Sequence, residues 1–119
     1  MLSMLKNYVL DENGNPVEEL DGEKWCKFFF CINNRSLAYT QLGDTTVSTV
    51  FLGMDHRFFG EGPPILWETM IFGGQFNDDC QRYTSKEDAL EGHAAMVEKV
   101  KRFQVEGTLL PPPDGEEDE

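Results

Sequence analysis

The alternation of hydrophobic and polar positions is clearest between Ser36 and Phe51. Two runs rich in β-branched and aromatic residues lie there on either side of a Gly-Asp pair, which favours a tight turn. A third run, Ile65 to Phe72, is bounded by a Pro-Pro pair and a Gly-Gly pair, and both pairs end regular structure. This pattern predicts a three-stranded antiparallel meander over Ser36 to Phe72.

A helical period follows the strands. Ser85 is a good N-cap, and acidic residues follow it in the first turn, where the helix dipole favours them. The pattern predicts a helix from Ser85 to Phe103 that covers one face of the sheet. Its apolar stripe consists of Ala89, His93, Met96 and Val100, with Leu90, Ala94 and Val97 beside it.

The N-terminal third has a weaker pattern. Asn-Gly and Asn-Pro pairs within residues 11–16 predict a turn, and the runs around it predict a small hairpin from Asn7 to Val17. Over Glu18 to Asn33, with Asp21 as the N-cap, large apolar residues recur at helical spacing. Three adjacent phenylalanines are poor helix formers, so a strand is the alternative to the helix that we favour. The apolar residues at helical spacing are Trp25, Phe28, Phe29 and Ile32.

Length and composition fit one domain. The chain has 119 residues, of which 39% are hydrophobic and 12% aromatic, and this is enough for a single core. Residues 107–119 contain three consecutive prolines and then five acidic residues, which predicts a disordered tail. We therefore expect one α+β domain over residues 1–106, in which the meander packs against a C-terminal and an N-terminal helix.

Charge limits the partners. The chain has 22 acidic and 10 basic residues and a net charge of −12, so it repels phosphate backbones and anionic membranes. Five of the acidic residues and none of the basic ones lie in 107–119, which leaves the remainder negative by seven charges. We expect no direct binding to nucleic acid or membranes, and a protein with a basic surface as the partner. The alternative explanation of the charge is that it serves solubility alone.

Localisation signals and cysteine spacing point to the cytosol. The longest nearly apolar run, 28–32, is far below the roughly 20 residues of a membrane span. The first residues lack a signal-peptide pattern. Cys26, Cys31 and Cys80 show no paired spacing of the kind that builds zinc or redox sites, so we expect reduced thiols. Asp78 and Asp79 would disfavour a thiolate at Cys80.

The segment from Gly53 to Pro64 is the first candidate site, because long loops in small domains are often functional. It places an acid, an imidazole, a cation and two aromatic rings together, and these groups could form a ligand pocket. The alternative is a scaffolding role, in which the carboxylate bonds its own loop and the rings close the core. The candidate binding residues are Asp55, His56, Arg57, Phe58 and Phe59.

Glu68 is the second candidate, because a carboxylate within an apolar strand is costly unless it is paired. His93, on the apolar stripe of the C-terminal helix, is its natural partner. If the two meet, they form an acid and imidazole pair that could move a proton, bind a metal or serve structure alone. Asp55 and His56 could complete a metal site, but no ligand spacing supports one. No nucleotide or hydrolase motif is present, so we assign no metal, cofactor or catalytic residue.

Four stretches are distinctive: VSTVFLGMDHRF at 47–58, GPPILWETMIFGG at 62–74, Arg82-Tyr83, and EGHAAMV at 91–97. Together they resemble a family of small uncharacterised proteins encoded by tailed bacteriophages and prophages. The resemblance implies an accessory gene product that works in the bacterial cytoplasm, and it implies no particular reaction. Its motif adds Thr69 to the candidate positions Asp55, His56, Glu68 and His93.

Three functions remain open from the sequence. The leading hypothesis is a non-enzymatic accessory protein that binds a basic host or phage protein, and that could inhibit a host nucleic-acid-binding or defence enzyme. The second is a small-ligand or metal-binding protein or an enzyme, with a pocket at 53–64 and at Glu68 and His93. The third is a minor component of the virion. The sequence leaves the oligomeric state open.

Overall fold

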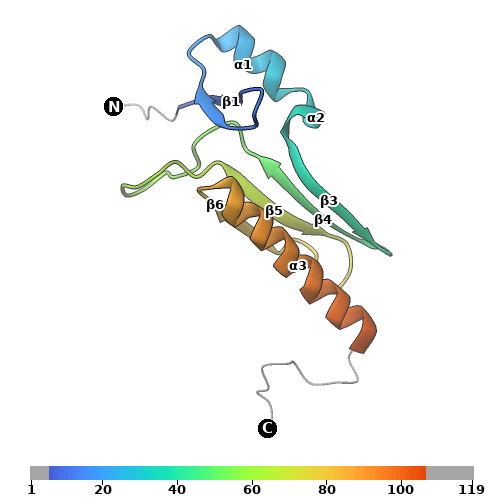
Figure 1. Ribbon diagram of the computed structural model, residues 1–119. Coiled ribbons are helices and arrows are strands. Elements are labelled where there is room, and N and C mark those ends of the chain that lie inside the picture. Colours follow the sequence, from blue (N-terminus) through green and yellow to red (C-terminus); the bar gives the residue numbers. More distant parts are fainter. Residues whose placement is uncertain (1–5, 107–119) are drawn as a thin grey trace.

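The computed structural model describes residues 6–106 (Figure 1). The predicted disordered tail, 107–119, lies outside the described residues. The elements in chain order are β1 (Tyr8–Leu10), β2 (Pro16–Glu18), α1 (Gly22–Phe29), α2 (Ile32–Arg35), β3 (Ser36–Leu42), β4 (Thr45–Phe51), β5 (Trp67–Phe72), β6 (Cys80–Tyr83) and α3 (Lys86–Glu106).

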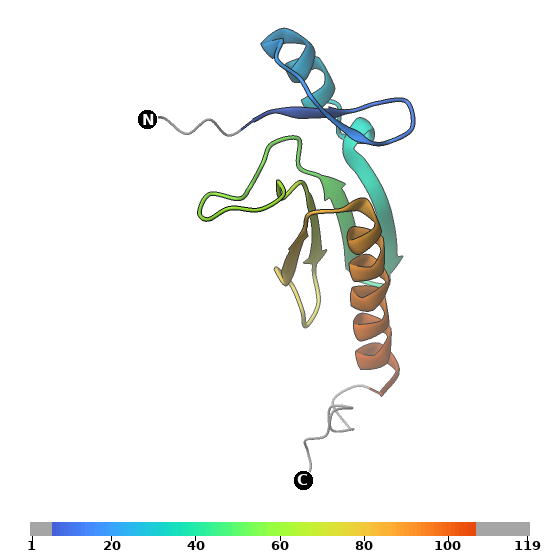
Figure 2. The same ribbon diagram turned by 60° about the vertical axis from the view of Figure 1, so that its left-hand side comes forward.

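An antiparallel sheet of order β3-β4-β5-β6 forms the centre of the molecule, and α3 crosses one of its faces and contacts all four strands (Figures 1 and 2). The predicted α+β class and the C-terminal helix are therefore confirmed. In both views α1 and β1 lie beyond one end of the sheet. The described residues leave the second face of the sheet without a covering helix.

The central sheet has four strands, one more than the predicted three-stranded meander. The additional strand, β6, lies within residues 73–84, for which no strand was predicted, because a Cys-Gln-Arg-Tyr run has no hydrophobic alternation to reveal it. Gly73 and Gly74 have positive φ values and pack so closely on the turn between β3 and β4 that a Cβ at either would collide with it. The predicted β3–β4 hairpin and its Gly43-Asp44 turn are confirmed.

The N-terminal hairpin is confirmed, and the helix that follows it is shorter than expected. Asp21 caps α1 by accepting hydrogen bonds from the backbone N–H groups of Glu23 and Lys24. The chain leaves the helix after Phe29, and α2 starts at Ile32 with a new axis (Figure 1). The strand alternative for this segment is wrong, and the break explains why Ile32 is exposed instead of joining the apolar face.

Helix α3 begins as predicted, because the Ser85 hydroxyl accepts a hydrogen bond from the backbone N–H of Asp88. It continues to Glu106, three residues beyond the expected end. Its main stripe is buried at Ala89, His93 and Val100. The adjoining stripe is only partly covered, since Leu90 is exposed.

The core beneath α3 has two apolar clusters. One contains Phe51, Leu66, Trp67 and Ala89, and the N-terminal lobe (residues 6–35) packs against it. The other contains Val47, Ile71 and Val100. A row of buried polar side chains, formed by Thr49, Thr69 and His93, separates the two clusters along β4 and β5.

Candidate functional site

The segment from Gly53 to Pro64 is held in shape by its own hydrogen bonds. The Oδ1 atom of Asp55 accepts the backbone N–H of Arg57 at 2.8 Å and that of Ile65 at 2.9 Å. The Asp55 carboxylate thus joins the two arms of the loop at its base. This contact matches the scaffolding interpretation of Asp55.

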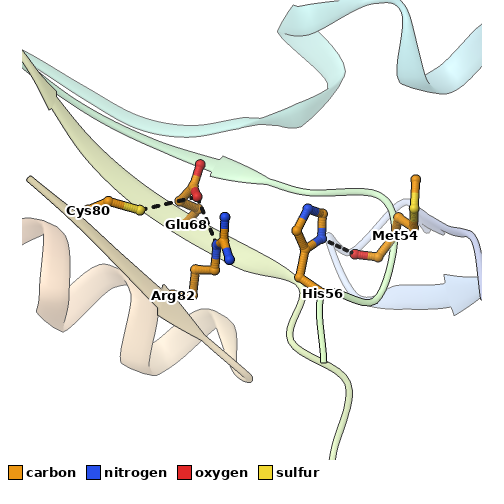
Figure 3. A network of polar contacts seen from close by, with 5 residues as sticks. All are labelled: Met54, His56, Glu68, Cys80 and Arg82. Carbon is orange, nitrogen blue, oxygen red and sulfur yellow. Dashed lines mark hydrogen bonds and ion pairs between the residues drawn. The ribbon is translucent and has the colours of Figure 1, made fainter. Parts of the chain in front are cut away.

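His56 and Arg57 make further contacts across the loop. The Nδ1–H of His56 donates to the carbonyl of Met54 at 2.8 Å, which leaves Nε2 as the ring's free nitrogen (Figure 3). The Nε–H of Arg57 donates to the carbonyl of Pro63 at 2.9 Å. The guanidinium lies over Gly62, where a Cβ would meet it. Both polar side chains therefore brace the loop.

The aromatic pair at the loop tip faces solvent. Phe58 is 55% exposed and Phe59 is 90% exposed. Figures 1 and 2 show this loop extending away from the sheet and from α3. The expectation that the two rings close the core is therefore wrong, because the core is already filled by Phe51, Leu66 and Trp67.

Glu68 lies on the uncovered face of the sheet. Its Oε2 atom accepts a hydrogen bond from the Nε–H of Arg82 at 2.9 Å and one from the thiol of Cys80 at 3.2 Å (Figure 3). Both partners are on β6, the neighbouring strand, and Arg82 is directly opposite Glu68 in the register. The carboxylate therefore has its charge partner within the sheet.

Cys80 is a poor nucleophile in this setting. Burial, together with the hydrogen bond to Glu68 and its negative charge, raises the pKa of the Cys80 thiol to about 11. The thiolate is disfavoured, as expected, but burial and Glu68 are responsible where Asp78 and Asp79 had been expected to act. The Cys80 and Glu68 pair is thus unsuited to thiol chemistry near neutral pH.

His93 is in the core, on the other side of the sheet from Glu68. Its Nδ1 is 2.8 Å from the hydroxyl of Thr49, and its Nε2 is 2.9 Å from that of Thr40. Thr49 is also 2.5 Å from the hydroxyl of Thr69. Burial lowers the pKa of His93, so the neutral imidazole is favoured.

Glu68 and His93, whose pairing the sequence had left open, do not meet. Thr69 points toward α3, and successive residues on a strand point to opposite faces, so Glu68 points away from the helix. The predicted residues are therefore in three places: the loop holds Asp55 to Phe59, the uncovered face holds Glu68, and the core holds Thr69 and His93. The pocket of the ligand-binding alternative would need these residues at one place, and within residues 6–106 they lie in three.

Sequence reasoning missed Thr40, Thr49 and the β6 residues. Thr49 alternates with Val47 and Phe51 on an inward-facing strand, and a hydroxyl at such a position signals a buried hydrogen-bond partner. Arg82 and Cys80 gave no comparable signal, because their strand was not predicted. Among residues 6–106, no cluster of three or more His, Cys, Asp or Glu side chains could hold a metal ion.

Comparison with known proteins adds no assignment: no family model, no curated protein and no solved structure matches the chain. Of the helices between residues 6 and 106, none is long and apolar enough to cross a membrane. Support for a function therefore comes from the loop and the charge of this chain.

Proposed function

We propose that the chain is an acidic accessory protein of a tailed phage or prophage that acts in the bacterial cytoplasm by binding another protein. The observation that carries the proposal is the exposed pair Phe58 and Phe59 at the tip of a braced loop. Aromatic side chains are the commonest energetic anchors of protein interfaces. Two of them on one tip suit an apolar pocket on a partner.

The bracing of the loop favours binding. An anchor that is already fixed loses less conformational entropy when it enters a pocket. The contacts of Asp55, His56 and Arg57 provide such fixation on both arms of the loop. These residues therefore support the tip as positioning residues.

Net charge selects the kind of partner. With 22 acidic and 10 basic residues, the chain attracts a basic protein over long range and repels nucleic acid. A host enzyme with a phosphate-binding groove has such a basic surface. Occupation of that groove would inhibit the enzyme, which is the sharpest form of this proposal.

The small-ligand alternative has less support. It needs Asp55, His56, Glu68 and His93 around one cavity, and His93 is bonded to threonines beneath α3. Protein binding requires only the exposed tip and the charge.

Affinity capture from a host lysate tests the proposal. The tagged chain is compared with a Phe58→Ser/Phe59→Ser variant at low and high salt. Phe30→Ser is the matched control, because Phe30 is also an exposed ring but lies in the N-terminal lobe. We expect one stoichiometric basic partner, retained by Phe30→Ser, lost by the double variant and weakened by salt. Equal capture by all three chains would overturn the role of the tip.

A further inference from the structure

The uncovered face of the sheet is electrically neutral in an otherwise acidic chain. The register aligns Tyr39, Ser48, Met70 and Cys80 in one row across the four strands. Glu68 and Arg82 lie in the next row, and they form an ion pair with each other at 2.9 Å. No other charged residue is present on β3, β4, β5 or β6.

This face also exposes large side chains. Tyr39 is 65% exposed and Phe72 is 48% exposed, on opposite sides of the sheet centre. An antiparallel sheet with one solvated face usually carries a polar set there. Aromatic and thioether side chains in that position are more typical of a contact surface.

We propose that a second copy of this chain packs on the uncovered face, so that two sheets meet face to face. Copies with a charge of −12 repel one another, so a shared contact must lie where the acidic residues are absent. The face of β3 to β6 meets this condition, because its single carboxylate is neutralised by Arg82. A basic partner, by contrast, gains no electrostatic attraction from a neutral face.

The area of the face sets the strength of the contact. Four strands about 4.8 Å apart, each presenting about 20 Å of its length, cover roughly 400 Å² per copy. Two such faces bury on the order of 800 Å² if each is treated as flat, without the added area of protruding side chains. This area is in the range of weak interfaces. We therefore expect a dimer that forms and dissociates with concentration.

Sedimentation over a concentration series tests the proposal on the full chain. The mass should rise from 13.6 kDa toward twice that value. Ser48→Glu puts a charge at the centre of both faces and should weaken association at least about tenfold. Leu20→Glu is the matched control, because Leu20 is exposed outside the sheet and should leave the dimer unchanged.

Cysteine alkylation supplies a second readout. Cys80 is on the proposed interface, whereas Cys26 and Cys31 are exposed in the N-terminal lobe. Rising protein concentration should slow the alkylation of Cys80 and leave the other two rates unchanged. A monomer at every concentration would overturn the proposal, and so would a dimer that survives Ser48→Glu with Cys80 still reactive.

Dimerisation should be independent of the loop tip. The Phe58→Ser/Phe59→Ser variant should still dimerise, because its changes lie outside the sheet. Loss of dimerisation in that variant alone would move the self-contact to the tip and overturn the face-to-face arrangement. Failure of partner capture would leave the dimer result unaffected.

Discussion

The imidazole of His93 and the hydroxyl of Thr49 share a hydrogen bond of 2.8 Å that joins α3 to the central strand of the core. The hydroxyl of Thr40 is hydrogen-bonded to the other ring nitrogen, so both nitrogens of a buried ring have partners. Hydroxyl groups satisfy a neutral imidazole but provide no negative charge for an imidazolium. This pairing makes the stability of the fold dependent on pH.

Acidification should destabilise the protein through His93. Burial lowers the pKa of His93 in the folded state, so the unfolded chain binds the proton more tightly. The stabilisation is fully present above the unfolded value of 6.5 and is lost as pH falls from there toward the lower folded pKa. The slope from this group is at most about 1.4 kcal/mol per pH unit. Urea titrations between about pH 8 and about pH 5 measure this slope.

The His93→Gln variant is the control for this pH effect. Glutamine can bond both threonines but does not titrate, so the difference in stability between wild type and variant should shrink as pH falls. His56 is present in both chains and cancels in the comparison. Parallel curves for the two proteins would refute the assignment to His93.

Thr49→Val should destabilise the fold by about 1–3 kcal/mol. The substitution keeps the shape and removes the hydroxyl, which leaves the Thr69 hydroxyl and Nδ1 of His93 without that partner. Urea denaturation measures the loss. Thr46→Val on the same strand is the matched control, because the Thr46 hydroxyl bonds Gln41 in an exposed setting and should matter much less. Equal losses would contradict the role of the buried row.

Asp55→Ala should loosen the loop while the sheet stays folded. The backbone N–H groups of Arg57 and Ile65 lose their acceptor, so their hydrogen exchange should speed up at least about tenfold, which corresponds to about 1.4 kcal/mol of local stability. Amide exchange by mass spectrometry resolves this segment. Glu61→Gln changes a charge in the same loop and should leave both rates as they are.

Glu68→Gln should make Cys80 more reactive. Burial, the hydrogen bond to Glu68 and its charge together raise the pKa of the thiol to about 11; the substitution removes the charge, while Arg82, which lowers the pKa, remains. The pKa of Cys80 should move toward the ordinary value of 9.0, and its alkylation at about pH 8 should accelerate. Cys26 and Cys31 serve as internal references. An unchanged rate at Cys80 would show that burial alone sets its pKa.

The sequence predicted the elements with the strongest periodicity. The β3–β4 hairpin was correct because its alternating β-branched residues have a turn at Gly43 between them. Helix α3 was correct because Ser85 caps it and its apolar stripe is long. The weak elements were harder, since β6 has four residues and the break after Phe29 follows no proline or glycine.

The main error in the predicted site concerned which side of β5 faces the core. Leu66, Met70 and Phe72 share the alternating face of Glu68, and these apolar neighbours led to the expectation that this face is buried. The register with β4 instead turns Thr69 and Ile71 inward, beside Thr49 and Val47. Pairing between strands decides this choice, and the sequence of one strand does not contain it. The Asp55 loop was identified correctly as a unit because its contacts are local.

The polar row between the two apolar clusters also fixes where α3 can sit. Sliding the helix by one turn would carry His93 away from Thr40 and Thr49, toward Val47 and Ile71 or toward Phe51 and Trp67. The threonines would at the same time lose the imidazole. A helix held only by apolar contacts could tolerate such slippage, whereas this one has a single favourable alignment on its sheet.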